Sequence, residues 1–393
     1  MIGCALTGNR RYYCWIGLLS VLVLAGIVAY LNQFSKGFIV THLTDQVSWG
    51  AYIANFTYLV GIAAAAVLLV FPSYIYHKQE MKEVVLLGEL LAVSAMIMCL
   101  LFIAVDLGRI DRFWHIIPFI GKLNFPYSIL AWDVVVLNVY LLLNLHIPGY
   151  LLYRKYLKKD PGGRHYLPFV YISIAWAISI HTVTAFLYSG IGGRPYWNSA
   201  ILAPRFLISA FASGPALLLI IFHLVKKLTD FKVSPYVFGY LKTVMTYALL
   251  INLFFLGCEA YKEFYTDSQH VASIRYLFLG LHGHHMLAPY IWSAVVMEIA
   301  ALAILLIPKL RNKWGLLGAA CVFIIIGIWI EKGMGLLIPG FIPSPLGDVN
   351  EYSPSLNEFF VCLGIWALGA LIYTVTAKVA IAIELGKLTV HPK

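Results

Sequence analysis

Ten apolar runs of about 20 residues constrain the fold of this chain more than any other feature of its sequence. A run of this length can cross a bilayer as an α-helix, because a helix satisfies its own backbone polar groups. The 393 residues are 61% hydrophobic and only 12% charged, so lipid is the expected solvent. The sequence predicts an all-α, polytopic membrane protein, a single integral membrane domain over 1–393, with helices near 13–31, 49–72, 84–105, 127–153, 166–189, 203–226, 236–259, 276–307, 314–337 and 356–383.

Lys and Arg residues fall unevenly between the loops. If the N-terminus is cytoplasmic, most of them lie in cytoplasmic loops and tails, as the positive-inside rule requires. We interpret 13–31 as a retained helix anchored by Arg10 and Arg11, because no Ala-x-Ala cleavage site follows it. This predicts a multi-pass plasma-membrane protein with cytoplasmic N- and C-termini. The net charge of +10 follows from the same bias and requires no nucleic-acid partner.

The order of runs and loops repeats within the chain. Runs two to five and runs six to nine each include a span ending in charged residues, and each set closes with a Gly- and Pro-rich loop. This pattern predicts two four-helix bundles, at 49–189 and 203–337. The first helix and the C-terminal helix, 356–383, would then lie at the periphery.

Charged residues gather where the third run ends, in the sequence VDLGRIDRFWH at 105–115, and Asp133 lies inside the fourth run. A carboxylate within a membrane span must be paired or protonated, and His115 and Arg109 are its plausible partners. An imidazole can hydrogen-bond a quinone carbonyl while a carboxylate orients the ring and passes on the proton. His115 and Asp133 are therefore the candidate catalytic pair. The alternative is a structural ion pair of Asp133 with Arg109.

Six further residues are candidates for contact with a bound quinone. Asp106 and Arg109, three residues apart at a helix end, are expected to pair and to orient His115. Tyr58 lies deep enough in its run to touch a ligand, and His181 suits either a proton relay or a packed core position. The full set is Asp106, Arg109, Trp114, Trp132, Tyr58 and His181.

The other polar residues within the runs are expected to have structural roles. Adjacent Glu331 and Lys332 are expected to form a local ion pair that ends the ninth helix. Glu89 and Glu298 are expected at the inner headgroup level, with the start of a cytoplasmic proton path as the alternative. The six cysteines include no CxxC or CxxCH, and LHGHHM has no neighbouring carboxylate ligand, so no metal cofactor is expected.

Several motifs occur together in a characteristic order. They are WGAYIANFTYLVGIAAA, DLGRIDRFWH followed by SILAWD, HTVTAFL with GGRPYWNSAILAPRF and LISAFASG, and EKGMGLLIPGFIPSPLG, and they span about 49–347. The ordered set resembles the NrfD/polysulfide-reductase family of integral membrane subunits. The ten runs and the long final motif are most similar to the DsrP-like subunits of sulfite-reduction-associated Dsr (DsrMKJOP-type) complexes.

This resemblance implies a subunit that is not catalytic alone but exchanges electrons between menaquinone or menaquinol and a partner complex. The implied partners are an iron–sulfur, ferredoxin-like subunit on the outer face and further redox subunits that include a multihaem cytochrome, in dissimilatory sulfur metabolism. The family's quinone site falls here on His115 and Asp133, near Asp106, Arg109 and Trp132. The loops after the third, fifth and ninth helices, which carry Arg112 and Arg194, are expected to form the docking platform.

Two other functions also fit parts of the sequence. A haem b cytochrome needs facing imidazoles, for which His146 with His223, or His181 with His284, are possible pairs. A proton- or ion-translocating transporter would suit the repeats and intramembrane charges. Transporter repeats, however, carry helix breaks near the midplane, whereas the Gly/Pro clusters here lie at the ends of runs, at 190–195 and 333–347.

Overall fold

The computed structural model describes residues 3, 7–117, 119–266 and 271–390. Within them, ten helices are long and apolar enough to span a membrane, which confirms the predicted all-α, multi-pass architecture. They are α2 (Arg10–Lys36), α3 with α4 (Ala51–Ala64 and Val67–Tyr74), α5 (Gln79–Asp106), α6 (Ile129–Tyr156), α7 (Leu167–Ser189), α8 (Leu202–Leu228), α9 (Pro235–Thr266), α11 (Ala288–Leu306), α13 (Trp314–Ile328, continued to Phe341) and α15 (Leu356–Glu384).

One predicted span is wrong. The run expected at 276–307 is divided into the short α10 (Val271–Phe278) and α11 by a turn. Gly280 and Gly283 in this turn both have φ values of 87°, a left-handed conformation that only glycine adopts without strain. The apolar residues before this turn therefore belong to α10 and not to the span.

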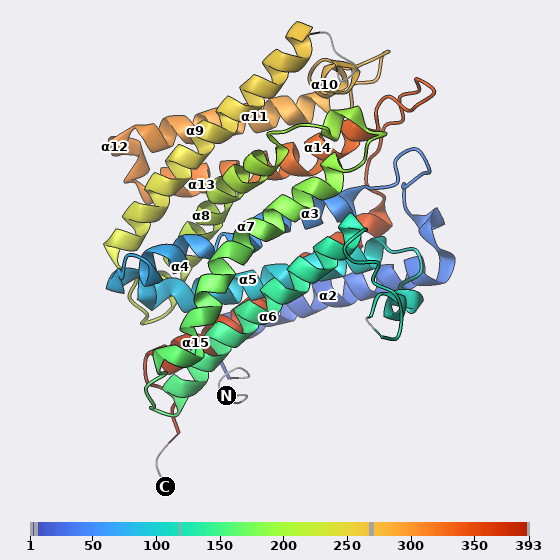
Figure 1. Cartoon of the computed structure of the whole chain (residues 1–393). Helices are drawn as coiled ribbons and strands as arrows, with labels where there is room; N and C mark the ends of the chain where they lie inside the picture. Colours follow the sequence, from blue (N-terminus) through green and yellow to red (C-terminus); the bar gives the residue numbers. More distant parts are fainter. Residues whose placement is uncertain (1–2, 4–6, 118, 267–270, 391–393) are drawn as a thin grey trace.

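Helix α3 is the centre of the molecule. All of its residues are buried, and it contacts α5, α7 and α8 (Figure 1). Small residues permit this packing, because a Cβ atom on Gly214 of α8 would overlap the Cβ of Ala65 at the end of α3. The close approach excludes larger side chains where the two helices meet.

The remaining helices lie on two sides of α3. Figure 1 shows α2, α6 and α15 on one side and α9, α11 and α13 on the other. Contacts join α5 with α6 and α6 with α7, whereas α8 packs on α9 and α13, and α11 packs on α13. Helices α2 and α15 pair with each other, and α15 also packs on α5. The division into two four-helix bundles stays a prediction, because α3 contacts both groups.

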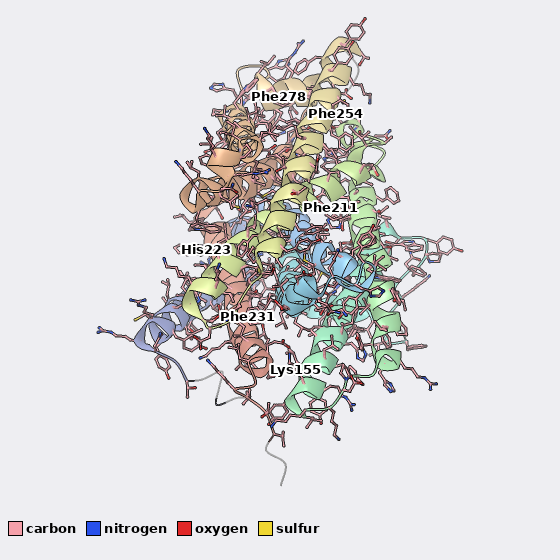
Figure 2. The ribbon with its side chains drawn as sticks, turned by 90° about the vertical axis from the view of Figure 1, so that its left-hand side faces the viewer. Lys155, Phe211, His223, Phe231, Phe254 and Phe278 are labelled. Atoms are coloured by element: carbon pink, nitrogen blue, oxygen red, sulfur yellow. The ribbon has the colours of Figure 1, made fainter. Side chains whose placement is uncertain are left out.

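The outer surface of these helices is apolar. Phe254 on α9 is 65% exposed and Val28 on α2 is 67% exposed, and Figure 2 shows Phe254 on the outside of its helix. Large exposed apolar areas are unstable in water but are the normal surface of a helix in hydrocarbon. These faces are therefore the lipid-contacting surface of the protein.

Two membrane helices depart from regular geometry. The second helix is interrupted at Ala65–Ala66, between α3 and α4, where the Tyr140 hydroxyl group donates to the Ala63 carbonyl oxygen (3.4 Å). This interruption lies inside a span, away from the Gly/Pro clusters at 190–195 and 333–347, and the sequence analysis did not predict it. Helix α13 passes into a π-helix, η5 (Trp329–Met334), and then into α14 (Gly335–Leu337) and the 3₁₀ turn η6 (Ile338–Phe341).

The α2–α15 contact provides a stability test. A Cβ atom at Gly26 would lie 2.6 Å from the Cα of Gly364, whereas nothing lies within 4 Å of a Cβ at Gly17 on the same helix. Gly26→Ala should force the helices apart and lower the free energy of unfolding by about 1–3 kcal/mol. Gly17→Ala should leave it unchanged or slightly raised, since alanine favours helix. Equal thermal unfolding of the two variants in detergent would contradict the close packing.

Candidate functional site

His115 and Asp133 lie in different environments. His115 belongs to the 3₁₀ helix η2 (Ile110–Ile116), where its exposed ring lies 3.9 Å from the ring of Trp114. Asp133, in the first turns of α6, is only 1% exposed. No hydrogen bond joins their side chains in the part of the chain that the structure describes. The expected imidazole–carboxylate pair is therefore not formed in this conformation.

Asp133 instead faces α7. The Thr184 hydroxyl group donates to Oδ1 of Asp133 over 3.0 Å, and Oδ2 has no hydrogen-bond partner among the described residues. One turn earlier on α7, His181 is 1% exposed, and its Nδ1 lies 3.1 Å from the Ala177 carbonyl oxygen. Because a carbonyl only accepts, Nδ1 carries hydrogen, and Nε2 is left buried without a described partner. The α6–α7 region thus holds two unsatisfied polar atoms.

Arg109 pairs with Asp111 and not with Asp106. Its Nε and Nη2 atoms donate to the two oxygens of Asp111 at 2.9 and 2.7 Å, and this hydrogen bonding lowers the pKa of Asp111. Asp106 is the last residue of α5 and keeps a buried oxygen without a described partner. The predicted Asp106–Arg109 pair, and the Asp133–Arg109 alternative, are wrong because the chain leaves α5 extended at Leu107 and carries Arg109 into an exposed loop.

The three aromatic residues that were predicted to contact a quinone also lie in different environments. Trp132 is 38% exposed, and its Nε1 donates to the Pro126 carbonyl oxygen over 2.8 Å. Trp114 is 44% exposed, whereas Tyr58 is 2% exposed inside α3. Tyr58, Asp133 and His181 are thus interior groups, whereas His115, Trp114 and Trp132 belong to the surrounding loop and helix surface.

An aromatic cluster that sequence reasoning missed covers α3 at its start. The ring of Trp49 lies 5.8 Å from Tyr188 and from Trp197, and Trp197 lies 5.1 Å from Phe341. Trp197 is held by a hydrogen bond from its Nε1 to the Leu336 carbonyl oxygen (2.9 Å). The sequence signal for this cluster was the run PYW at 195–197. A buried Trp or Tyr usually needs a hydrogen-bond partner for its polar atom, so these residues tend to pack at specific positions.

A second polar group, the buried charge cluster, lies in the other half of the molecule. Arg205 on α8 donates to Oε1 of Glu331 from Nη2 (2.6 Å) and Nε (3.2 Å) and also binds Glu259 of α9. Asn252 of α9 donates from Nδ2 to Glu331 (2.8 Å) and to Glu298 of α11 (3.3 Å). We define the cluster as these five residues, all at most 8% exposed: Arg205, Asn252, Glu259, Glu298 and Glu331.

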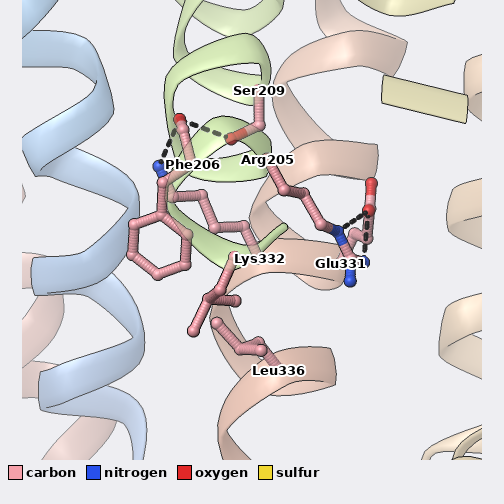
Figure 3. Close-up of a pocket in the computed structure, with 7 residues that line it drawn as sticks. Arg205, Phe206, Ser209, Glu331, Lys332 and Leu336 are labelled. Atoms are coloured by element: carbon pink, nitrogen blue, oxygen red, sulfur yellow. Dashed lines mark hydrogen bonds and ion pairs between the residues drawn. The ribbon is translucent and has the colours of Figure 1, made fainter. Parts of the chain in front are cut away.

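Lys332 points away from Glu331. Figure 3 shows Glu331 facing Arg205 while Lys332 lies toward Phe206. The Nζ atom of Lys332 is 3.2 Å from the Phe206 carbonyl oxygen and 4.4 Å from the centre of its ring. The predicted Glu331–Lys332 ion pair is wrong, because in the π-helix the two residues face different neighbours. A cavity with room for about one water is lined by Leu202, Arg205, Phe206, Ser209, Glu331, Lys332 and Leu336.

The two predicted headgroup-level glutamates are also buried. Glu298 and Glu89 are each 1% exposed, and neither carboxylate oxygen of Glu89 has a described partner. Both are therefore enclosed by neighbouring helices, and their predicted depth at the inner headgroup level stays a prediction. The signal for the charge cluster was Arg205, a positive residue that the predicted orientation places on the outer side, where such residues are rare.

The histidines proposed as haem ligands have other neighbours. The ring of His223 stacks on Trp314 at 3.6 Å, and His146 lies 4.6 Å from the ring of Phe169. His284 is bound to Glu351 (3.2 Å) in an exposed loop, whereas His181 is buried. Across the described ranges, no three His, Cys, Asp or Glu residues are grouped as metal ligands would be.

The fold defines a multi-pass membrane protein whose interior holds groups of buried polar and charged side chains. The family model "Polysulphide reductase, NrfD" matches residues 39–343, and the chain belongs to this family.

The chain is similar to three curated proteins over nearly its whole length. A selenate reductase subunit of Mesobacillus selenatarsenatis is 24% identical over 92% of each chain. The Hdr-like menaquinol oxidoreductase integral membrane subunit of Archaeoglobus fulgidus is 23% identical, over 94% of this chain and 93% of that protein. The menaquinone reductase integral membrane subunit of Nitratidesulfovibrio vulgaris is 22% identical, over 96% and 93%. The predicted closeness to DsrP-like subunits stays a prediction.

Arg205 allows a test of the charge cluster. Arg205→Met would leave Glu259 and Glu331 buried without their cation, and should lower the free energy of unfolding by about 3–5 kcal/mol. Lys155→Met removes an ion pair to Glu384 whose lysine is 49% exposed, and should cost at most about 1 kcal/mol. Both can be measured by unfolding of the purified chain in detergent. Similar losses for the two variants would exclude a buried ion pair at Arg205.

Proposed function

We propose that this protein is the quinone-interacting membrane subunit of a respiratory redox complex, exchanging electrons between menaquinone or menaquinol and a partner subunit. The observation that carries the proposal is the NrfD family match over 39–343. Two relatives named for menaquinol or menaquinone chemistry, similar over more than nine-tenths of this chain, support it. The chain alone is not the enzyme. The relative named for selenate reduction suggests that the terminal substrate is set by other subunits, so a role in sulfur metabolism is a finer proposal.

The geometry supports a site centred on Asp133 and His181. The buried Oδ2 of Asp133 and Nε2 of His181 lack partners among the described residues, and such atoms are costly unless a ligand or proton satisfies them. A quinol hydroxyl group can donate to either atom, and a protonated Asp133 can donate to a quinone carbonyl. Menaquinone, when bound, supplies the two-electron chemistry that the side chains cannot.

Each residue has a distinct role in this proposal. Asp133 accepts or donates a proton through Oδ2, while the Thr184 hydroxyl group holds its other oxygen. His181 presents Nε2 as a hydrogen-bond acceptor because Nδ1 is committed to Ala177. Tyr58 is part of the interior wall. His115, with Asp106, Arg109, Trp114 and Trp132, forms the lip at the ends of α5 and α6, from which protons exchange with the aqueous phase.

The loop between α5 and α6 is the best-supported part of the docking platform for an iron–sulfur subunit. Phe113 and Tyr127 in it are 54% and 89% exposed, and Arg112 and Lys122 are also exposed, so the loop offers both aromatic and charged contacts. Arg194 instead packs over the ring of Phe341 (4.7 Å) and is part of the protein's own structure. On the positive-inside orientation this loop faces outward, with both termini cytoplasmic.

Asp133→Asn tests the chemistry. Asparagine keeps the size and the Thr184 contact but cannot take up the proton, so quinol-dependent electron transfer should fall about 10²- to 10⁴-fold with quinone affinity retained. Asp230→Asn, in an exposed pair with Lys387, is the matched control and should be unaffected. His115→Phe should mainly weaken quinone binding. Near-normal turnover of Asp133→Asn in the intact complex would return this carboxylate to a structural role.

Charge reversal tests the docking platform. Arg112→Glu together with Lys122→Glu should release the iron–sulfur partner during purification, because both side chains are exposed and neither packs within the membrane helices. Lys309→Glu is the control, since it reverses an exposed lysine on α12 (Pro308–Arg311) at the opposite end of the helices. Unchanged co-purification of the double variant would argue against this loop as the platform.

A further inference from the structure

The buried charge cluster leads to an inference that does not depend on quinone binding. We propose that this cluster is a proton-binding site within the membrane, and that the proton resides on Glu298 and exchanges with water. The site lies among α8, α9, α11 and the π-helix η5, apart from Asp133 and His181. Its ligand is a proton, and its function would be proton storage or transfer in the half of the molecule formed by these helices.

The charges around the cluster do not balance without a proton. Three buried carboxyl groups, Glu259, Glu298 and Glu331, share this interior with two buried cations, Arg205 and Lys332. Glu263, further along α9, has its own cation in Lys262 (3.3 Å). A net charge buried in a low-dielectric interior is strongly disfavoured, and a carboxyl group neutralises it by binding a proton. At least one of the three carboxyl groups must therefore be protonated.

The geometry selects Glu298 as the protonated group. Arg205 donates to Glu331 and Glu259 but makes no described hydrogen bond to Glu298. Glu298 accepts a hydrogen bond from the neutral Asn252 through Oε2, lies beside the carboxyl group of Glu331, and has no described hydrogen-bond partner at Oε1. The Oδ1 atom of Asn252 is likewise without a described donor. If Glu298 carries a proton on Oε1, that oxygen becomes a hydrogen-bond donor, and the buried Oδ1 of Asn252 is an acceptor that lacks one.

The helices packed against α11 supply no further counter-charge to Glu298. α9 contributes Asn252 and Glu259, and η5 contributes Glu331 and Lys332. α13 presents Gly327, where a Cβ atom would lie 2.9 Å from Cγ of Glu298, so this glycine makes room for the carboxyl group. The charged residues of α10 and α12, which pack beside α11, are Arg275, Lys309 and Arg311, and none of them is buried. The ammonium group of Lys332 donates to the Phe206 carbonyl oxygen, so it contributes a buried positive charge to this interior but makes no described hydrogen bond to Glu298.

Chemical labelling tests the proposal on the full-length chain in liposomes. Dicyclohexylcarbodiimide partitions into lipid and adds to protonated carboxyl groups, and the modified residue can be located by mass spectrometry. Glu298 should be labelled near neutral pH, and infrared spectra should contain a carboxylic-acid carbonyl band that shifts in D₂O and is lost in Glu298→Gln. Absence of label on Glu298, or of the D₂O-sensitive band, would overturn the proposal.

Changing the number of buried charges gives a second test, because a purely structural role of Glu298 predicts no change in its labelling. Glu259→Gln removes one negative charge and leaves Glu298 in place, so Glu298 no longer needs its proton and its labelling should fall about tenfold or more. Glu263→Gln, one turn further along α9 and paired with Lys262, should leave the labelling unchanged. Equal labelling of Glu298 in wild type and Glu259→Gln would refute the charge-balance argument. Neither measurement requires a quinone or a partner subunit.

Discussion

The cost of placing charge in lipid governs this structure from its surface to its interior. The outer faces of the helices are apolar because hydrocarbon cannot solvate polar groups. The ionised groups that remain within the spans are buried inward, where Arg205 meets Glu259 and Glu331. Pairing of this kind offsets desolvation only when the geometry is good, and here the guanidinium group provides several donors at once.

The π-helix in the ninth span determines which neighbours its two charged residues contact. Its wider turn directs Glu331 toward α8 and α9, while the next residue, Lys332, reaches Phe206. One helix therefore presents opposite charges to two interior regions.

Sequence reasoning succeeded where a single helix decides the outcome. Run length predicted the spans, because each membrane helix satisfies its backbone alone. It failed where a local turn overrode the apolar pattern, as at Gly280 and Gly283. It also failed for pairs: Asp106 with Arg109 and Glu331 with Lys332 are near in sequence, but Arg109 binds Asp111 and Glu331 binds Arg205, 126 positions away.

The sequence by itself determined the membrane class, the approximate positions of most membrane helices and the choice of Asp133, His181 and Tyr58 as candidate residues. Only the tertiary structure decided their partners: Thr184 for Asp133, and Arg205 with Asn252 for Glu331. The physical reason is that hydrophobicity is a property of one segment, whereas a buried polar group is satisfied by whichever helix packs against it. Helix packing in lipid depends on small residues and shape, such as Gly214 against Ala65, and apolar periodicity does not encode these contacts.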